Sequence, residues 1–173
     1  MENNCSLYLI TGLMASGKST VSELLAKKMD RSVHLHGDIY RKMIVSGRET
    51  MGNNLNEEAA RQLNLRYRLA AQAAKEYCNA GFNVVLQDNY YGNALNEMAE
   101  LLLPHIPKIV VLNPDLESIR QREENRNKKG YTGFDMKAFY DGFIGETPKI
   151  GYWIDTSELT PEETVKKILD YYK

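Results

Sequence analysis

The stretch LITGLMASGKST, residues 9–20, decides the fold class of this chain. An apolar run leads into it, Gly12 and Gly17 enclose four residues, and Lys18 and Ser19 come directly after them. It matches the phosphate-binding pattern G-x-x-x-x-G-K-[S/T] at every fixed position. The glycines let the backbone wrap closely around a polyphosphate, and the next helix offers unpaired amides and the positive end of its dipole. We therefore expect a strand, a phosphate-binding loop and a helix here.

The same loop predicts the nucleotide and the metal ion that the chain would use. Lys18 would reach the β- and γ-phosphates of ATP, and Ser19 would ligate the Mg²⁺ that bridges them. The loop residues expected to contact ATP are Gly12, Ala15, Ser16, Gly17, Lys18, Ser19 and Thr20. The loop alone leaves kinases, GTPases and motor ATPases open as classes, so the choice among them depends on residues further along the chain.

Short apolar runs alternate with helical patterns along the rest of the chain. We expect strands at 6–10, 32–36, 82–88, 108–112 and 150–155, and helices at 18–29, 38–46, 57–80, 94–103, 114–127 and 161–172. Asn113 is expected to cap a helix that begins at Pro114, and Thr160 to cap one that begins at Pro161. Strands that alternate with helices predict a single α/β domain over residues 1–173, with a parallel sheet covered on both faces.

Composition excludes several classes of protein. The 173 residues are 43% hydrophobic and 26% charged with a net charge of −1, which is typical of a soluble globular chain and offers no general attraction to nucleic acid or acidic membranes. No stretch reaches the roughly 20 apolar residues that span a bilayer, and the N-terminus lacks a basic signal region. Cys5 and Cys78 stand outside any CxxC pattern, so we expect structural thiols in a reducing cytoplasm rather than a disulfide or a zinc site.

Two motifs that would indicate other nucleotide-binding classes are missing or misplaced. The stretch nearest to a DxxG pattern, DGFIG at 141–145, has one residue too many and comes too late to be a GTPase switch. The third expected strand ends in Gln87-Asp88-Asn89, with one carboxylate where motor ATPases carry two. The sequence therefore favours a kinase.

A carboxylate comes directly after each of two expected strands. Asp38 comes just after the run 32–36, with Arg41 three residues on, and Asp88 ends the run 82–88. Because the carboxyl ends of neighbouring parallel strands share one crevice, we expect both carboxylates to lie beside the phosphate loop. Asp38 would accept the proton of a substrate hydroxyl as general base, unless it only caps a helix. Asp88 would contact Mg²⁺ or substrate, unless it is an ordinary loop carboxylate.

A basic segment later in the chain has the properties of a lid. Arg122 and Arg126 share one helix face, and their like charges repel unless an anion sits between them. We interpret residues of about 122–134 as a lid whose arginines neutralise transition-state charge and exclude water. The alternative is a salt-bridged surface helix, because acidic residues stand at ion-pair spacing from Arg120 and Arg126.

The order of these motifs resembles the small P-loop kinases: GxxxxGKS, GDxxR after the second strand, an aspartate ending the third, RxxxR, and a last strand closing with Asp155-Thr156-Ser157. Within that group the chain most resembles the chloramphenicol phosphotransferase-like family, and beyond it the gluconate kinases and the kinase domains of polynucleotide kinases. The resemblance implies a three-layer, five-stranded parallel sheet of nucleoside-monophosphate-kinase type, and transfer of the γ-phosphate of ATP to a hydroxyl.

The resemblance also implies roles for particular residues. Asp38 would be the general base, Arg122 and Arg126 would act from the lid, and Thr156 and Ser157 would lie beside the adenine. One departure counts against gluconate as substrate: gluconate kinases carry a His-Phe pair just after the lid arginines, whereas residues 130–134 here read GYTGF.

Residues 39–79 are expected to form the substrate-binding half of the crevice. Arg41 would hold an acidic or phosphorylated substrate. Arg66 is a further candidate for the substrate site, although Arg66 and Arg68, each taken alone, are expected to be solvated surface arginines. The helix 57–80 is expected to bury Leu63, Tyr67, Ala70, Ala74 and Tyr77. We interpret His34 and His36 as structural.

The leading hypothesis is a cytoplasmic kinase for a small hydroxylated molecule such as an antibiotic, a nucleoside or a sugar derivative. A 5′-hydroxyl polynucleotide kinase is the second enzyme hypothesis, less favoured because the net charge of −1 offers no open basic channel. An ATP-binding regulatory protein without kinase activity is the alternative of another class. The acceptor and the oligomeric state stay open.

Overall fold

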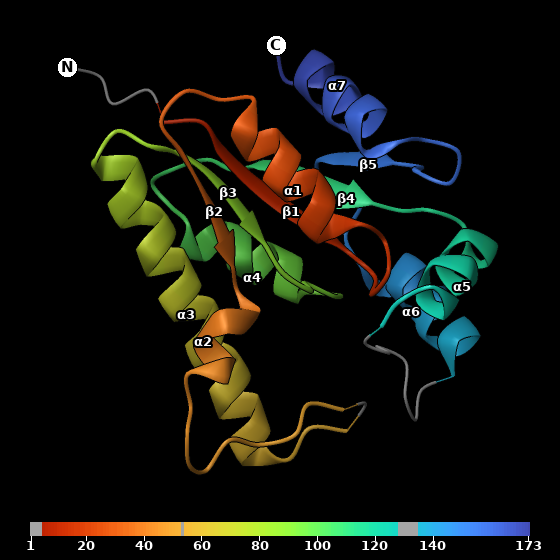
Figure 1. Cartoon of the computed structure of the whole chain (residues 1–173). Coiled ribbons are helices and arrows are strands. Elements are labelled where there is room, and N and C mark those ends of the chain that lie inside the picture. Colours follow the sequence, from red (N-terminus) through yellow and green to blue (C-terminus); the bar gives the residue numbers. More distant parts are fainter. Residues whose placement is uncertain (1–4, 53, 128–134) are drawn as a thin grey trace.

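The computed structural model describes residues 5–52, 54–127 and 135–173. Five strands form one parallel sheet in the order β2-β3-β1-β4-β5 (Figure 1). The strands are β1 (Leu7–Gly12), β2 (Ser32–His36), β3 (Asn83–Gln87), β4 (Lys108–Leu112) and β5 (Tyr152–Ile154). The helices are α1 (Lys18–Lys27), α2 (Asp38–Lys42), α3 (Glu57–Asn79), α4 (Ala94–Leu101), α5 (Leu116–Glu124), α6 (Met136–Glu146) and α7 (Pro161–Tyr171).

Both faces of the sheet are covered, which is why its strands read as continuous apolar runs. Along β1, Leu7 and Leu9 pack into the core that also contains side chains of α3, α4 and α6. Tyr8 and Ile10 point the other way, into the core shared with α1 and α7. The predicted three-layer α/β fold with five parallel strands is confirmed. Within the described part of the chain, no helix is both long and apolar enough to cross a bilayer.

Of the two predicted helix caps, one is confirmed and the other is wrong. Thr160 begins α7 with a complete capping box, as expected, because its side chain accepts from the Glu163 amide and Glu163 accepts in return. The start predicted at Asn113-Pro114 is wrong. The Asn113 amide donates to Ile154 O at 2.9 Å, which extends the sheet by one residue, and α5 starts later with Asp115 as its cap.

One helix was not predicted at all. Helix α6 covers MKAFYDGFIGE, and the stretch DGFIG at 141–145 lies inside it. Two glycines and several aromatic residues weaken its helical pattern, because both classes have low helix propensity. Its start is nevertheless encoded locally, since the Asp135 side chain accepts a hydrogen bond from the Ala138 amide at 3.0 Å.

The expectation for the cysteines is also wrong: Cys5 and Cys78 form a disulfide, with their Cα atoms 5.2 Å apart. Cys5 precedes β1 and Cys78 lies near the end of α3, so the pairing depends on the packing of that helix against the sheet. Spacing along the chain carries no signal for a pair separated by 73 residues. Because disulfides are uncommon in reducing compartments, the bond does not support the expected cytoplasmic location, which stays a prediction.

Candidate active site

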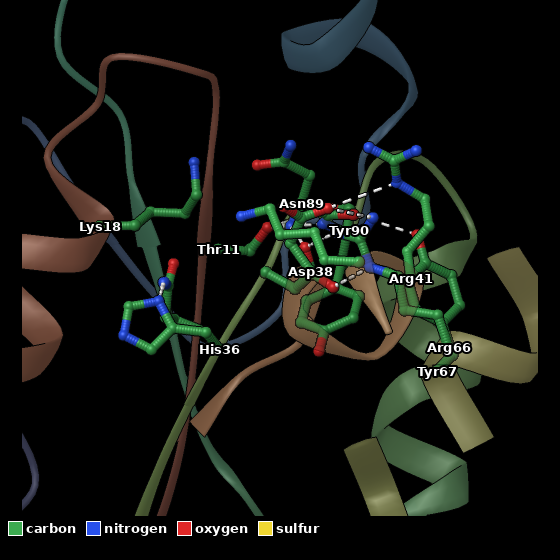
Figure 2. Close-up of polar contacts among 12 residues, drawn as sticks. Thr11, Lys18, His36, Asp38, Arg41, Arg66, Tyr67, Asn89 and Tyr90 are labelled. Carbon is green, nitrogen blue, oxygen red and sulfur yellow. Dashed lines mark hydrogen bonds and ion pairs between the residues drawn. The ribbon is translucent and has the colours of Figure 1, made fainter. Parts of the chain in front are cut away.

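The site lies where β1, β2 and β3 end. The phosphate loop comes after β1, Asp38 begins α2 two residues after the end of β2, and Asp88 comes directly after β3. At this edge of the sheet, α2 and α3 stand on one side and α5 and α6 on the other (Figure 1). Figure 2 shows Lys18 on one side of the site and Asp38 with Arg41 and Arg66 on the other. The predicted convergence of these three segments is therefore present.

The backbone of the phosphate loop requires its glycines. Gly12 has a φ of +150°, and a Cβ there would approach Leu112 O to 2.5 Å. Gly17 (φ 96°) and Ala15 (φ 65°) adopt left-handed conformations. Left-handed residues in such loops form anion-binding concavities lined by backbone N–H groups. The loop thus has the shape of a phosphate cradle.

Lys18 lies inside this loop and donates to two backbone carbonyls, Gly12 O at 2.8 Å and Leu13 O at 2.7 Å. Burial of its ammonium group lowers the pKa of Lys18 to about 7, and the partly compensating carboxylate is Asp88. A buried cation held by neutral carbonyls is best stabilised by an anion. The arrangement suits a phosphate group entering the loop.

Two further groups at the loop are relevant to a nucleotide with its metal ion. Ser16 Oγ is buried and makes no hydrogen bond to any residue that the structure describes, so it is available to a ligand oxygen. Ser19 Oγ accepts from Gln87 Nε2 at 3.2 Å, and the same amide lies 2.6 Å from His36 Nδ1. The sequence did not single out Gln87 or His36 for this site, although both end strands beside the loop. Thr20 is exposed on the first turn of α1.

Asp38 is surrounded by cations. Its carboxylate pairs with Lys42 at 2.7 Å, Arg66 at 3.2 Å and Arg41 at 3.5 Å. Partial burial opposes ionisation, but the hydrogen bond from Lys42 and the charges of Arg66 and Arg41 lower the pKa of Asp38 below its ordinary value. The predicted proximity of Arg41 and Asp38 is confirmed. The helix cap position is occupied by Gly37, so Asp38 is not the cap of α2.

Arg66 is not a surface arginine, contrary to expectation. It is 7% exposed. It binds Asp88 through two hydrogen bonds, in which Nε donates to Oδ2 at 2.6 Å and Nη2 donates to Oδ1. Arg68, in contrast, is exposed as expected. The guanidinium of Arg66 links the carboxylates that come after β2 and β3, because it also donates to Asp38. Both oxygens of Asp88 are therefore engaged by Arg66, while its roles toward Mg²⁺ and substrate stay predictions.

Gly37 makes this cluster possible. Its φ is ordinary, but a Cβ at this position would overlap Asp88 Oδ2. The Gly37 amide also donates to Gln87 O at 3.0 Å, which extends the pairing of β2 and β3 up to the site. The glycine of the GD pair is thus needed for the close approach of a neighbouring carboxylate.

The segment after Asp88 is fixed from two sides. Tyr67 is buried, as expected, and its hydroxyl donates to Asn89 O at 3.0 Å. Thr11 Oγ1 accepts from the Tyr90 amide at 2.9 Å (Figure 2). Of the other side chains expected to be buried on α3, Tyr77 is 41% exposed, so that prediction is wrong. The anchored backbone holds Asp88 and Asn89 in place.

The two lid arginines have different surroundings. Arg122 donates to Ser16 O at 3.3 Å and to Thr156 O at 2.6 Å, which joins α5 to the phosphate loop and to the segment after β5. Arg126 pairs with Glu123 at 2.9 Å, as the surface-helix interpretation expects, yet its charge also contributes to lowering the pKa of Lys18. Residues 128–134 of the predicted lid lie outside the described residues.

The segment expected beside the adenine is also ordered by local contacts. Thr156 is buried, and its Oγ1 makes no hydrogen bond. Ser157 Oγ accepts from the Asp115 amide at 2.8 Å and donates to Asp155. Arg122, Thr156 and the phosphate loop therefore lie together, whereas Ser157 stabilises the start of α5.

Comparison with known sequences shows the family. Residues 7–139, which include the phosphate loop, Asp38, Asp88 and both lid arginines, match the family described as AAA domain. The chain belongs to this AAA domain family.

Solved structures show the fold that this AAA domain chain shares. A sugar kinase from a Janibacter species is similar with a TM-score of 0.71 and 14% identity over 97% of this chain and 94% of its own. A shikimate kinase from Bacteroides thetaiotaomicron is similar with a TM-score of 0.67 and 19% identity over 96% of this chain and 98% of its own. A gluconokinase from Sinorhizobium meliloti is similar with a TM-score of 0.63 and 15% identity over 95% of this chain and 90% of its own. The fold is that of the P-loop kinases, and the finer resemblance to chloramphenicol phosphotransferases stays a prediction.

Proposed function

We propose that this chain transfers the γ-phosphoryl group of ATP to the hydroxyl of a small molecule, with Asp38 as general base. The observation that carries the proposal is the convergence of the Lys18 loop and Asp38 at one edge of the sheet. The kinase names of the similar structures support the same reaction class. A protein that only binds ATP would not need a carboxylate placed opposite the phosphate loop.

The residues of the loop fit ATP with Mg²⁺. Lys18 offers a buried cation, and Ser16 Oγ is a buried group without a hydrogen-bond partner. Ser19 would hold Mg²⁺, which is usually bound through few protein groups together with phosphates. Bound Mg²⁺ would neutralise charge that develops on the transferred group. Arg122 on α5 and Arg126 just after its end would add further positive charge.

Asp38 would act on the acceptor. Its lowered pKa keeps the carboxylate ionised at neutral pH, so it can accept a hydrogen bond from a hydroxyl and then its proton. Arg66 fixes the position of this carboxylate from within the protein. Arg41 and Lys42 are more exposed and would hold an anionic part of the acceptor. Asp88 would act mainly by holding Arg66.

The test is phosphoryl transfer by the wild type and by Asp38→Asn, measured with labelled ATP against antibiotics, nucleosides, sugars and a 5′-hydroxyl oligonucleotide. We expect turnover to fall at least about 100-fold while ATP still binds. Asp30→Asn, at the amino-terminal edge of the sheet, is the matched control and should keep full activity. Lys18→Ala should lose productive ATP binding instead.

Three outcomes would contradict parts of the proposal. Unchanged turnover in Asp38→Asn would remove the general-base assignment. Transfer to the oligonucleotide alone would favour a polynucleotide kinase. Binding of ATP without transfer to any acceptor would favour the regulatory alternative.

A further inference from the structure

A groove of about 270 Å³ lies between the segment after β3 and one face of α6. Its lining includes three aromatic side chains, Tyr91, Phe139 and Phe143, together with Gly142 and Glu146. The four α6 residues among them share one face of that helix, since they are spaced one, three or four positions apart. None of these residues belongs to the phosphate loop or to the Asp38 cluster.

The groove has rigid walls. The Tyr91 ring packs edge-on against Phe139 at 5.2 Å and against Phe143 at 5.6 Å between ring centroids. The Gly92 amide donates to Thr147 Oγ1 at 3.1 Å, which ties the segment after β3 to the end of α6. Aromatic rings held edge-to-face in this way form an apolar wall whose shape is set before any ligand arrives.

Gly142 keeps this groove open. A glycine inside a helix costs roughly 1 kcal/mol relative to alanine, so a structural reason for it would be expected. Packing against residues 5–52, 54–127 and 135–173 supplies none, because a Cβ at Gly142 would have no atom of theirs within 4 Å. A larger side chain at this position would instead extend into free space beside the aromatic rings. The glycine therefore leaves room in the groove, and packing within the helix layer does not require it.

The groove is joined to the proposed active site through the chain. Tyr91 stands three residues after Asp88, and the anchored backbone of Asn89 and Tyr90 connects them. Along this segment, a molecule whose hydroxyl reaches Asp38 would extend toward α6. Glu146 brings a negative charge to the exposed end of the groove, so a positively charged substituent would be favoured there.

We propose that the groove binds a flat apolar ring of the phosphoryl acceptor, with a cationic substituent beside Glu146. The volume supports one ring with its substituents, since a cavity of about 150 Å³ accepts benzene. The inference rests on the proposed function, because it names the class of molecule that the kinase site would phosphorylate. The acceptor is accordingly a hydroxylated, amine-bearing ring compound.

The test uses three probes with the same ring and hydroxyl: benzyl alcohol, its 4-aminomethyl derivative and its 4-carboxylate. Their affinities for the full chain are measured by saturation-transfer NMR. We expect the cationic probe to bind best and the anionic probe worst. Gly142→Leu should weaken all three at least about tenfold by filling the groove, and Glu146→Gln should remove the preference for the cation.

Gly145→Leu is the matched control, because this glycine is on the same helix, is exposed, has equally open space at its Cβ and does not line the groove. It should bind the probes like the wild type. Equal binding by wild type and Gly142→Leu, or no binding of any probe, would overturn the inference.

The readouts separate this inference from the proposed function. Probe binding that depends on Gly142, without phosphorylation of any alcohol, supports the groove and counts against the kinase reaction. Phosphorylation of the ring-bearing alcohols that is unaffected by Gly142→Leu supports the kinase and overturns the groove.

Discussion

The two halves of the site are built in different ways. The donor half is one continuous loop, in which backbone carbonyls hold Lys18. The acceptor half is assembled from three distant segments, in which Asp38, Arg66 and Asp88 pair with one another. The donor half is left with a cation that needs an external anion, whereas the two carboxylates of the acceptor half already have cationic partners within the protein. Substitutions in the donor half should therefore mainly weaken ATP binding, whereas substitutions in the acceptor half should mainly lower the free energy of unfolding.

The largest expected effect tests this difference directly. Arg66→Met would leave the Asp88 carboxylate buried and unpaired, so we expect a loss of about 3–5 kcal/mol in the free energy of unfolding, measured with urea. Arg68→Met, two residues along the same helix and exposed, should change it by less than about 0.5 kcal/mol.

Lys18→Met makes the same comparison on the donor side. It removes two hydrogen bonds but also a buried cation, so we expect stability to stay within about 1 kcal/mol of the wild type while ATP binding is lost. An equal destabilisation by Arg66→Met and Lys18→Met would contradict the distinction between the two halves.

A smaller effect is expected from Gly37→Ala. The added methyl group would displace the Asp88 carboxylate from Arg66, which should cost about 1–3 kcal/mol of stability. Gly52→Ala is the control, because its Cβ would have no neighbour within 4 Å. If both variants unfold at the same urea concentration, the close approach at Gly37 does not matter for the cluster.

The smallest effect concerns the junction between the two halves, where β2 packs beside α1. Burial, and to a lesser extent the neighbouring His36, lowers the pKa of His34 to about 4, and Glu23 only partly opposes this. The unfolded state therefore binds more protons between about pH 4 and 6.5, and stability should fall as pH drops through that window. Because the ring is only half-buried, we expect a loss on the order of 1 kcal/mol.

His34→Leu should lack this part of the pH dependence. The measurement is urea unfolding of both proteins at pH 4.5 and 7, in which the difference between them isolates His34 from the carboxylates. Parallel pH profiles would show that His34 is not buried as a neutral ring.

Sequence reasoning succeeded where the signal is local. Residues 12–19 encode a loop conformation by themselves, and Thr160 with Glu163 encodes a helix start, so both could be predicted. The sheet could be inferred from the alternation of strands and helices. The placement of Asp38 and Asp88 could then be inferred from the rule that parallel strands end at one edge.

The failures concern contacts between distant residues. The partner of Arg66 lies 22 residues away on another element, so helical periodicity alone placed it at the surface. Cys5 and Cys78 meet only after α3 has packed on the sheet. Helix α6 was missed because its two glycines, of which Gly142 lines the groove, reduce the local preference for a helix.

The disulfide divides the chain in a way that the layers of the fold do not. It closes a covalent ring from Cys5 to Cys78 that contains the phosphate loop, Asp38 and Arg66, and leaves Asp88 and the lid arginines outside. A protease that cut once in the exposed stretch 45–48 would therefore not release a fragment. The two pieces would migrate as one band until a reducing agent separated them.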